Sequence, residues 1–435
     1  MNYFLIPGRL PSLSLLELCA VLSHNGGSLA LDRAGSEAIP FSFDGVLDTV
    51  PLIHRLGGAI KGGRVMGSTK KDFSCAAAYI TNDLLGRSTA AHERITFGVS
   101  AYSVSQKPLK GNEARRIALW IQREGIALKK CLREHGVSAR FVAPQHGATA
   151  LSSVVVEKNH LVTEPNVEYV LLIDNDTIDI GITAAVQEFE EYARRDYGRP
   201  HRDMKTGLLP PKLARIMINL ARAEKDASLL DPFCGLGTVL QEALLLEYTN
   251  VSGSDIDEKN VGATKENISW LKKWGLAQTG SGSVFAAAKS VPDPVCVSVK
   301  HCDAQKLASC FPKRSIGAIV TEPTLGPALS ARHQHVSEKE IDALCDLYIQ
   351  SFRSFHEALA RAGRVVIVFP VWMADSRQRH IPCLNALMKQ GFINVTVPDS
   401  LRRVLSGVTE RGSLVISRPD ARVARELFVF EKVTR

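Results

Sequence analysis

A glycine-rich turn between an apolar strand and a helix is the first segment that could carry chemistry. It reads DPFCGLGT over residues 231–238. Glycine lets the backbone approach a ligand closely, and the N-terminus of the following helix favours a negative or polar group. A dinucleotide fingerprint would place a third glycine at position 240, where Leu240 stands instead. The turn predicts a polar cofactor, and Leu240, with no hydride-transfer constellation elsewhere, argues against a nicotinamide dehydrogenase.

Acidic side chains follow the next two predicted strands. Asp255 ends the second strand, 24 residues after Asp231, and Asp303 follows the third. A carboxylate at the end of the second strand is placed to accept both ribose hydroxyls of a nucleoside, and Asp303 could read the exocyclic amine of adenine. A helix N-cap or a turn is the alternative role for both, and the one we favour for Asp257, which precedes a helix. Together with the glycine turn, the two acids indicate a nucleoside site.

Alternating strands and helices after residue 197 would bring these side chains to one sheet edge. We predict strands at 229–232, 251–255, 295–302, 316–321, 364–370, 392–397 and 426–431, with helices centred near residues 243, 265, 348 and 384. Repeated strand–helix–strand units predict a parallel, doubly wound α/β sheet.

The part of the chain before residue 193 begins with about 95 residues in which no chemistry is visible. Its pattern predicts a small α+β domain, whose expected elements are a strand at 95–104, a helix at 112–132 ending near Gly136, a strand at 139–143, a helix or strand at 151–161 and a buried strand at 168–173.

Two segments carry an excess of positive charge. Residues 107–140 hold nine Lys or Arg against three Glu, and residues 194–222 hold eight against two Asp. Such patches could follow a polyanion, and the candidate phosphate ligands are Arg115, Arg116, Arg199 and Arg202. Two solvated helix faces would give the same charge pattern, so charge alone does not decide.

Composition limits the remaining classes. A chain of 435 residues, 45% hydrophobic and 23% charged, predicts two or three globular domains. The longest apolar stretch, residues 365–374, is about half of what a bilayer requires, and we expect neither a signal peptide nor a membrane anchor. Nine cysteines without a CxxC pair argue against zinc and against a disulfide framework, as in a cytoplasmic protein.

The motifs resemble those of a known family. DPFCGLGT, SDID and HCDA look like motifs I, II and III of class I methyltransferases, in the expected order. Residues 195–203 (RDYGRPHRD) and 207–214 (GLLPPKLA) resemble the linker and pre-motif helix of the THUMP-containing tRNA guanine-N2 methyltransferases. The resemblance covers nearly the whole chain, strongly over 194–256 and loosely before 150.

That resemblance implies three domains and a reaction. Residues 1–95 would be an N-terminal, ferredoxin-like α+β region, 96–192 a THUMP-like RNA-binding domain, and 193–435 a class I Rossmann-like methyltransferase with a seven-stranded, mostly parallel sheet. The implied cofactor is S-adenosyl-L-methionine, and the implied substrate is the exocyclic N2 amine of a guanosine in tRNA. We expect a cytoplasmic monomer without a metal.

The cofactor ligands follow from the matched motifs. Pro210 and Pro211 suit the first turn of a helix that would present its N-terminus and Lys212 to the methionine carboxylate, unless the helix only docks on the sheet. The expected contacts are Lys212, Asp231, Phe233, Gly235, Gly237, Thr238, Asp255, Ile256, Asp303 and Ala304.

The loop after the fourth strand, TEPTLGP at 321–327, departs from the family. Related amino-methyltransferases carry Asp or Asn, two prolines and an aromatic residue there. The chemistry needs an acceptor for the target amine's hydrogens, a rigid turn and a flat surface that stacks a flipped base. Glu322 can supply the acceptor and Pro323 the turn, but Leu325 occupies the aromatic position. The candidate substitutes, which are more often ordinary core or surface residues, are Trp372, His333 and His335.

Three functions stay open on this reasoning. The first is tRNA guanine-N2 methylation, and the second is methylation of a different amine in RNA, DNA or protein. The third is RNA binding by a non-catalytic homologue. Because Glu322 keeps an acceptor in the loop, we favour an enzyme.

Overall fold

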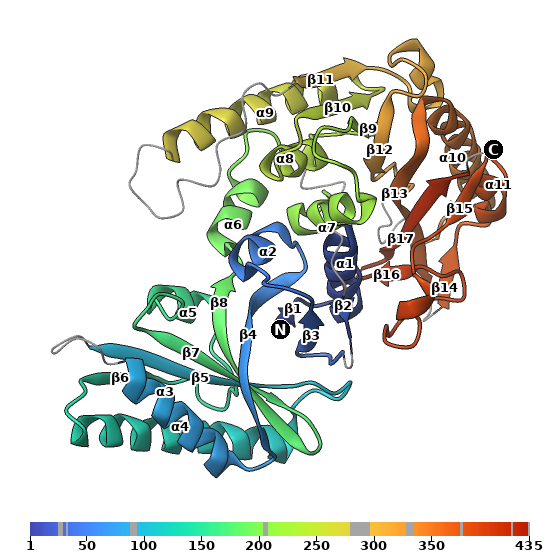
Figure 1. Ribbon diagram of the computed structural model, residues 1–435. Helices are drawn as coiled ribbons and strands as arrows, with labels where there is room; N and C mark the ends of the chain where they lie inside the picture. Colours follow the sequence, from blue (N-terminus) through green and yellow to red (C-terminus); the bar gives the residue numbers. More distant parts are fainter. Residues whose placement is uncertain are drawn as a thin grey trace. The chain divides into compact units, whose positions relative to one another are not determined.

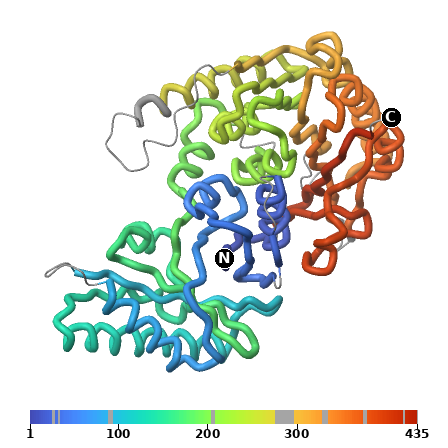
Figure 2. Tube along the Cα trace, viewed as in Figure 1, coloured from blue at the N-terminus to red at the C-terminus, as the bar shows by residue number. Residues whose placement is uncertain are grey.

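The chain divides into two compact units, Met1–Phe189 and Glu190–Arg435. Each is organised around one sheet, and Figures 1 and 2 follow the chain through both. The computed structural model describes residues 1–24, 29–31, 34–87, 94–202, 208–278, 296–327, 335–374, 377–418 and 421–433.

Unit 1 contains one mixed sheet. Its strands are β1 (Asn2–Pro7), β2 (Leu29–Ala30), β3 (Ile39–Phe43), β4 (Ala59–Lys70), β5 (Ile95–Ser103), β6 (Ala139–Val142), β7 (Val167–Ile173) and β8 (Thr177–Val186). Its helices are α1 (Pro11–His24), α2 (Thr49–Arg55), α3 (Phe73–Arg87), α4 (Gly111–Glu134) and α5 (Ser153–Lys158). The strand order is β2-β3-β1-β4-β8-β7-β5-β6, with β5 parallel to both neighbours. The proposed boundary at 95/96 falls at the start of β5, so the two predicted N-terminal regions share this sheet, and their division stays a prediction.

Local pattern placed the main elements of unit 1 correctly. Helix α4 buries an apolar stripe that includes Ile117, Ile121 and Leu128. It ends before Gly136, whose φ of +79° suits glycine, and the amide of Val137 bonds back to the carbonyl of Leu132 at 2.8 Å. The predicted strands at 95–104, 139–143 and 168–173 are β5, β6 and β7, and the ambiguous segment at 151–161 contains the helix α5.

Unit 2 contains a sheet of nine strands. These are β9 (Leu229–Asp231), β10 (Asn250–Asp255), β11 (Cys296–His301), β12 (Ile316–Thr321), β13 (Leu359–Ala374), β14 (Arg377–His380), β15 (Phe392–Asn394), β16 (Leu414–Ile416) and β17 (Val423–Lys432). The helices are α6 (Phe189–Tyr197), α7 (Pro211–Ala221), α8 (Thr238–Leu245), α9 (Glu258–Gln278), α10 (Glu338–Ala358) and α11 (Leu384–Met388), with 3-10 turns η2 (Ala304–Ser309) and η3 (Asp399–Leu401).

The strand order of unit 2 creates a functional edge. The main path runs β11-β10-β9-β12-β13-β17-β15, with β14 paired to β13 and β16 to β17. The first five strands pair in parallel, and the remaining pairings are antiparallel. The chain order reverses between β9 and β12, and ligands of open α/β sheets bind beside the carboxyl ends of strands at such a point. All seven predicted strands are present. The prediction of seven in total was wrong, because β14 and β16 are only four and three residues long and β14, RQRH, has no apolar alternation.

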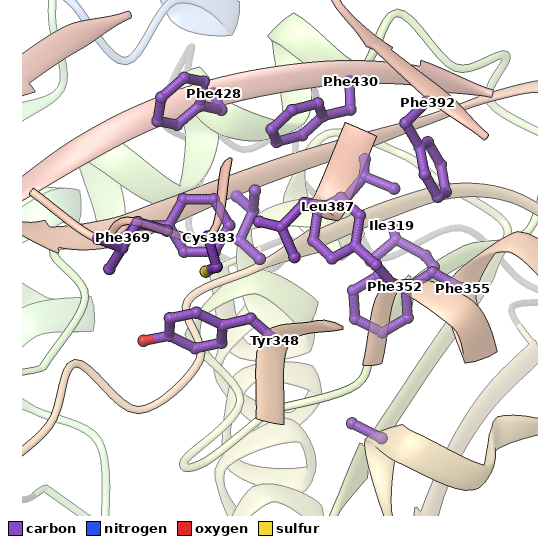
Figure 3. Close-up of a cluster of buried hydrophobic side chains, with 14 of the residues drawn as sticks. Ile319, Tyr348, Phe352, Phe355, Phe369, Cys383, Leu387, Phe392, Phe428 and Phe430 are labelled. Carbon is purple, nitrogen blue, oxygen red and sulfur yellow. The ribbon is translucent and has the colours of Figure 1, made fainter. Parts of the chain in front are cut away.

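An aromatic core holds together the strands that carry the site. Phe352 of α10 lies 5.2 Å from both Phe392 and Phe430, centroid to centroid, in edge-on contacts, and Phe428 stacks on Phe430 at 5.5 Å (Figure 3). Edge-on and offset rings contribute about 0.5–1.5 kcal/mol per pair beyond area burial. This core therefore fixes α10 against β17, the strand that contains Arg425.

Cysteine pairing differs from the prediction. Cys302 and Cys310 form a disulfide, with Cα atoms 6.5 Å apart. They lie eight residues apart in sequence, and the turn η2 between them folds the chain back, which residue spacing alone did not reveal. Among the described residues, no helix is long and apolar enough to cross a bilayer, and no group of three or more His, Cys, Asp or Glu could hold a metal ion.

Candidate functional site

The glycine turn adopts backbone conformations that require glycine. Gly235 and Gly237 have φ of +48° and +81°, a region that side chains with a Cβ rarely occupy. A Cβ on Gly237 would lie 2.8 Å from the side chain of Thr264. The Thr264 hydroxyl in turn donates to the carbonyl of Gly235 at 2.7 Å. The turn is thus held close to α9.

Leu240, the residue that breaks the dinucleotide fingerprint, has a packing role. Its side chain is fully buried, and a Cβ on Gly253 of β10 would lie only 2.7 Å from it. In a dinucleotide fingerprint, a third glycine on the helix allows the helix and strand to approach closely. Here Gly253 on β10 allows α8 to approach that closely. That exchange supports the inference that the cofactor is not a dinucleotide.

Asp255 ties the second strand to the glycine turn. One carboxylate oxygen accepts the amide of Gly235 at 2.9 Å, and the other accepts the amide of Asp257 at 2.9 Å and Nδ2 of Asn260 at 3.2 Å. Its neighbour Ile256 is 66% exposed although it directly follows a buried strand. The edge therefore presents a fixed carboxylate beside an apolar surface, which suits a ribose and a base. The N-cap role of Asp257 is confirmed, because its carboxylate accepts the amide of Lys259 at 2.9 Å.

Asp231 is a buried carboxyl at the end of the first strand. It accepts the hydroxyl of Thr321 at 2.6 Å and the amide of Phe233 at 3.1 Å. Burial raises the pKa of Asp231 to about 7; hydrogen bonds oppose this shift, and the charges of Asp255 and Glu322 add to it. The carboxyls of Asp231, Asp255 and Glu322 consequently form one electrostatically coupled group at the carboxyl edge.

Arg199 is enclosed by unit 2 instead of facing solvent. It is 3% exposed, and its Nη1 donates to the hydroxyl of Thr238, the first residue of α8, at 2.8 Å. Its Nε and Nη2 are buried and have no hydrogen-bond partner among the described residues. Burial lowers the pKa of Arg199. Arg199 therefore lies beside the start of α8 and not on the outer surface along which an RNA backbone would run, so that prediction was wrong for Arg199, whereas Arg202 is exposed as expected.

An ion-pair network fixes the segment that carries Arg199. Glu242 of α8, 1% exposed, accepts Nε of Arg195 at 2.6 Å and Nε of Arg215 at 2.8 Å. Both guanidinium groups and the ammonium of Lys212 lie over the ring of Tyr192, at 4.4, 5.3 and 5.1 Å from its centroid. The network joins α6, α7 and α8. Lys212 contacts this ring, and its contact with a methionine carboxylate stays a prediction.

The third strand ends in the predicted Asp303. Its Oδ1 accepts the amide of Gln305 at 2.9 Å and caps η2, which begins at the buried Ala304. The capping alternative is thereby observed, and adenine recognition by Asp303 stays a prediction.

Glu322, the predicted acceptor, is already paired. Arg425 of β17 donates from Nε to Oε2 at 2.5 Å and from Nη2 to Oε1 at 2.8 Å, a bidentate bridge. Both side chains are largely buried, at 17% and 12% exposure for Arg425 and Glu322. Burial opposes ionisation of Arg425, but the bonds and charge of Glu322 raise its pKa above the ordinary value. Neither the partner nor its strand position was predicted from the sequence.

The rest of the loop that follows β12 is held in place by burial and by a hydrogen bond from α10. Pro323 is buried, and the hydroxyl of Tyr348 donates to the carbonyl of Thr324 at 2.6 Å. Trp372 is 2% exposed and belongs to the aromatic core, so it cannot offer a face to a base. Of the other proposed platforms, His335 is exposed and His333 lies outside the described residues.

Unit 1 contains a separate basic cavity. A volume of about 850 Å³ is lined by the predicted Arg115 and Arg116. The lining also includes Lys71, Phe73, Asn112, Ile117, Leu119, Trp120 and Arg123. Phe73 and Trp120 contact each other with ring centroids 4.8 Å apart. Cations beside aromatic rings form a surface that could accept phosphates and stack bases.

Comparisons with known proteins agree with the geometry of unit 2. The family model described as the RMKL-like methyltransferase domain matches residues 199–376. The chain is 32% identical over 177 residues to a tRNA (guanine(10)-N2)-dimethyltransferase of Methanothermobacter thermautotrophicus, covering 40% of this chain and 43% of that protein. It is also 32% identical over 186 residues to the enzyme of the same name from Pyrococcus abyssi, covering 42% and 44%.

These matches span less than half the length of the two relatives. The crystal structure of TrmN from Thermus thermophilus aligns over 100% of both chains with a TM-score of 0.50 at 18% identity, which shows a shared fold. Unit 2 thus has the class I methyltransferase fold that the motifs predicted. Residues 199–376 are thus similar to the RMKL-like methyltransferase domain, and about two fifths of the chain is similar to tRNA (guanine(10)-N2)-dimethyltransferases.

Proposed function

We propose that this protein transfers a methyl group from S-adenosyl-L-methionine to the exocyclic N2 amine of a guanosine in tRNA. The observation that carries the proposal is the position of Glu322. It is a hydrogen-bond acceptor at the carboxyl end of β12, coupled to the carboxyls of Asp231 and Asp255 beside the glycine turn. An acceptor for an amine therefore adjoins the strand ends suited to a nucleoside cofactor.

The residues at this edge fit the cofactor. Asp255 would hold the ribose, and Ile256 would contact the adenine. Arg199 has two buried donors without a partner among the described residues, and a carboxylate would satisfy both in one bidentate contact. When bound, S-adenosyl-L-methionine supplies a methyl group on a positively charged sulfur.

The chain's own residues would orient the target amine. Glu322 accepts a hydrogen of N2, which directs the nitrogen lone pair at the methyl carbon, and Pro323 keeps the loop rigid. The cofactor would supply the methyl group and keep the C–S electron pair as a neutral thioether, and the Glu322 carboxylate would take the proton that N2 loses and pass it to solvent. Arg425 orients Glu322 by donating a hydrogen bond to each of its carboxylate oxygens. Each carboxylate oxygen retains a second lone pair for the substrate.

Unit 1 would hold the RNA. Arg115, Arg116 and Arg123 line the cavity beside Trp120, and Arg202 in unit 2 is exposed. We retain the THUMP-like role predicted for residues 96–192, and we propose that the protein works in the cytoplasm as a monomer. Salt-dependent tRNA binding that weakens on replacement of Arg115 and Arg116 would support this assignment.

A second candidate is methylation of a different amine. The loop lacks the aromatic residue that stacks a base, and Trp372 is too buried to replace it. Stacking contributes about 1–3 kcal/mol, so a smaller or differently held substrate is compatible with Leu325 at this position.

One experiment separates the two candidates. The purified protein is incubated with bulk tRNA and methyl-labelled cofactor, and the tRNA is digested to nucleosides. Labelled N2-methylguanosine or its dimethyl form supports the first candidate. A different labelled nucleoside, or label in added DNA or protein only, supports the second.

The role of Glu322 is tested in the same assay. Glu322→Ala should lower the rate ~10²–10³-fold, by analogy with other positioned polar groups, and leave cofactor and tRNA affinity nearly unchanged. Glu322→Gln should be milder, because its amide oxygen still accepts. Glu410→Ala, at an exposed glutamate of the same unit, is the control. Equal rates in all three variants would move the catalytic role elsewhere.

A further inference from the structure

Unit 2 has a second cavity, of about 680 Å³, on a different edge of the sheet. Its lining combines four cationic side chains with a histidine and contains no acidic residue. The lining residues are Arg314, His356, Arg361, Lys389, Gln390, Gly391, Lys432 and Val433. We call this group the basic pocket. None of its members belongs to the glycine turn, the acidic strand ends or the Glu322 loop.

The topology separates the basic pocket from the cofactor edge. Arg314 precedes β12 by two residues, whereas Glu322 directly follows the same strand. Lys432 ends β17, which runs antiparallel to β13, and pairs with Phe392 at the start of β15. The basic pocket therefore lies at the amino ends of the parallel strands, and the length of β12 separates it from the carboxyl edge.

The walls of the basic pocket are fixed by hydrogen bonds. The ammonium of Lys432 donates to the carbonyls of His356 and Leu359, at 2.6 and 2.8 Å. The amide of Arg314 donates to the carbonyl of Glu357 at 3.0 Å. Gly391 has φ of +93°, and a Cβ there would lie 2.8 Å from Nε2 of His356. The chain thus brings α10, α11 and β17 together around a space that a larger residue at 391 would narrow.

The positive charge in the basic pocket is not neutralised by the described protein. Burial lowers the pKa of Lys432, and the charge of Arg314 lowers it further. Burial, Lys432 and Arg314 lower the pKa of His356, against the opposing charge of Glu357. Glu357 itself is bonded to Lys313 at 3.0 Å. Arg361 and Lys389 are exposed and form no ion pair with any described residue.

We propose that the basic pocket binds a phosphate group. Guanidinium groups bind phosphate oxygens in bidentate fashion, and Lys adds a compact charge. A multivalent anion would remove the mutual repulsion of four cations that have no acid among them. Two sources share this chemistry: the backbone of a bound RNA, and a free phosphate or phosphate-bearing small molecule. The inference does not depend on methyl transfer.

The test uses the full-length protein and a double charge reversal of two exposed residues, Arg361→Glu with Lys389→Glu. The control is Lys265→Glu with Lys273→Glu on α9, which changes the net charge equally, at exposed sites outside the basic pocket. Arg361→Gln with Lys389→Gln removes the charges without adding repulsion. Thermal unfolding of each variant checks that the fold is intact.

Two probes distinguish the sources. Calorimetric titration with inorganic phosphate should show at least tenfold weaker binding in both pocket variants than in the control. For tRNA, each lost phosphate contact lowers the slope of log affinity against log salt by ~0.7–0.9. A slope reduced by about one to two in the pocket variants assigns the site to RNA. An unchanged slope with lost phosphate binding assigns it to a free ligand. If neither probe distinguishes the pocket variants from the control, the proposal is overturned.

Discussion

Replacing Arg425 by methionine tests whether its bridge to Glu322 serves catalysis. The bidentate bridge joins β17 to the loop after β12, across 103 residues of sequence. Methionine keeps much of the volume but removes the charge and both donors. Glu322 would remain buried, close to the carboxyls of Asp231 and Asp255, without a positive partner. We expect the variant to fold and to lose both stability and rate at neutral pH.

The magnitude follows from burial. Removing one partner of a fully buried ion pair costs about 3–5 kcal/mol, and an exposed pair contributes ~0–1 kcal/mol. With 17% and 12% of the two side chains exposed, we expect a loss of roughly 2–3 kcal/mol. An unpaired buried carboxylate also holds its proton to higher pH. Loss of the positive partner favours the protonated carboxyl, so the acid limb of the methylation rate should move to higher pH.

The sheet provides a matched control. Arg364 of β13 and Glu431 of β17 form a similar cross-strand bridge at 2.9 Å, with 22% and 31% exposure. Arg364→Met should cost stability without moving the pH profile, because that pair lies six residues along β13 from Pro370, the residue that pairs with Arg425. Urea unfolding gives the stabilities, and initial methylation rates between pH 5.5 and 9 give the profiles. The double variant Arg425→Met with Glu322→Gln should recover stability relative to Arg425→Met alone. Identical profiles for Arg425→Met and Arg364→Met would refute a positioning role for Arg425.

Two further outcomes follow from the cofactor edge. Arg199→Met should weaken the binding of S-adenosyl-L-methionine about tenfold or more. The binding of 5′-methylthioadenosine, which lacks the amino-acid part, should be nearly unaffected. Calorimetry that shows equal losses of affinity for both ligands would exclude Arg199 from the carboxylate contact. Asp231→Asn should make the free energy of unfolding less dependent on pH. The pKa of Asp231 is about 7 in the folded protein and 3.8 as the ordinary value. The wild-type carboxyl therefore stabilises the fold at low pH and loses this contribution, at most roughly 4 kcal/mol, as pH rises from about 4 to 7. Unfolding curves with equal pH slopes for wild type and variant would contradict this.

The sequence predicted those parts of the site that depend on local pattern. The glycine turn, Asp255 and Asp303 each follow a strand of unit 2 that apolar runs had marked, and the helix at 258–278 begins where Asp257 caps it. Such features depend on neighbours within a few residues. They need no knowledge of how distant strands pair.

The features that the sequence did not predict depend on tertiary contacts. Arg199 lies in a basic segment of the sequence. The residues beside it in sequence do not reveal that the Arg195–Glu242 ion pair places Arg199 next to Thr238, at the start of α8. Arg425 reaches Glu322 only because β17 inserts antiparallel beside β13, so that Pro370 pairs with Arg425. The number of charged residues in a segment does not distinguish a solvent-exposed arginine from one that pairs with a buried carboxylate.

The balance of charge at the carboxyl edge gives a reason for both buried arginines. Three carboxyls, Asp231, Asp255 and Glu322, lie near one another there, and burial, with the charges of Asp255 and Glu322, raises the pKa of Asp231 to about 7. Arg425 offsets one of these charges, and on our proposal the two donors of Arg199 that have no partner among the described residues would bind the cofactor carboxylate. The edge therefore keeps a net negative character that favours a positively charged sulfur and disfavours the neutral thioether left after methyl transfer. On this reasoning, electrostatics at one sheet edge serves both the binding of the cofactor and the release of its product.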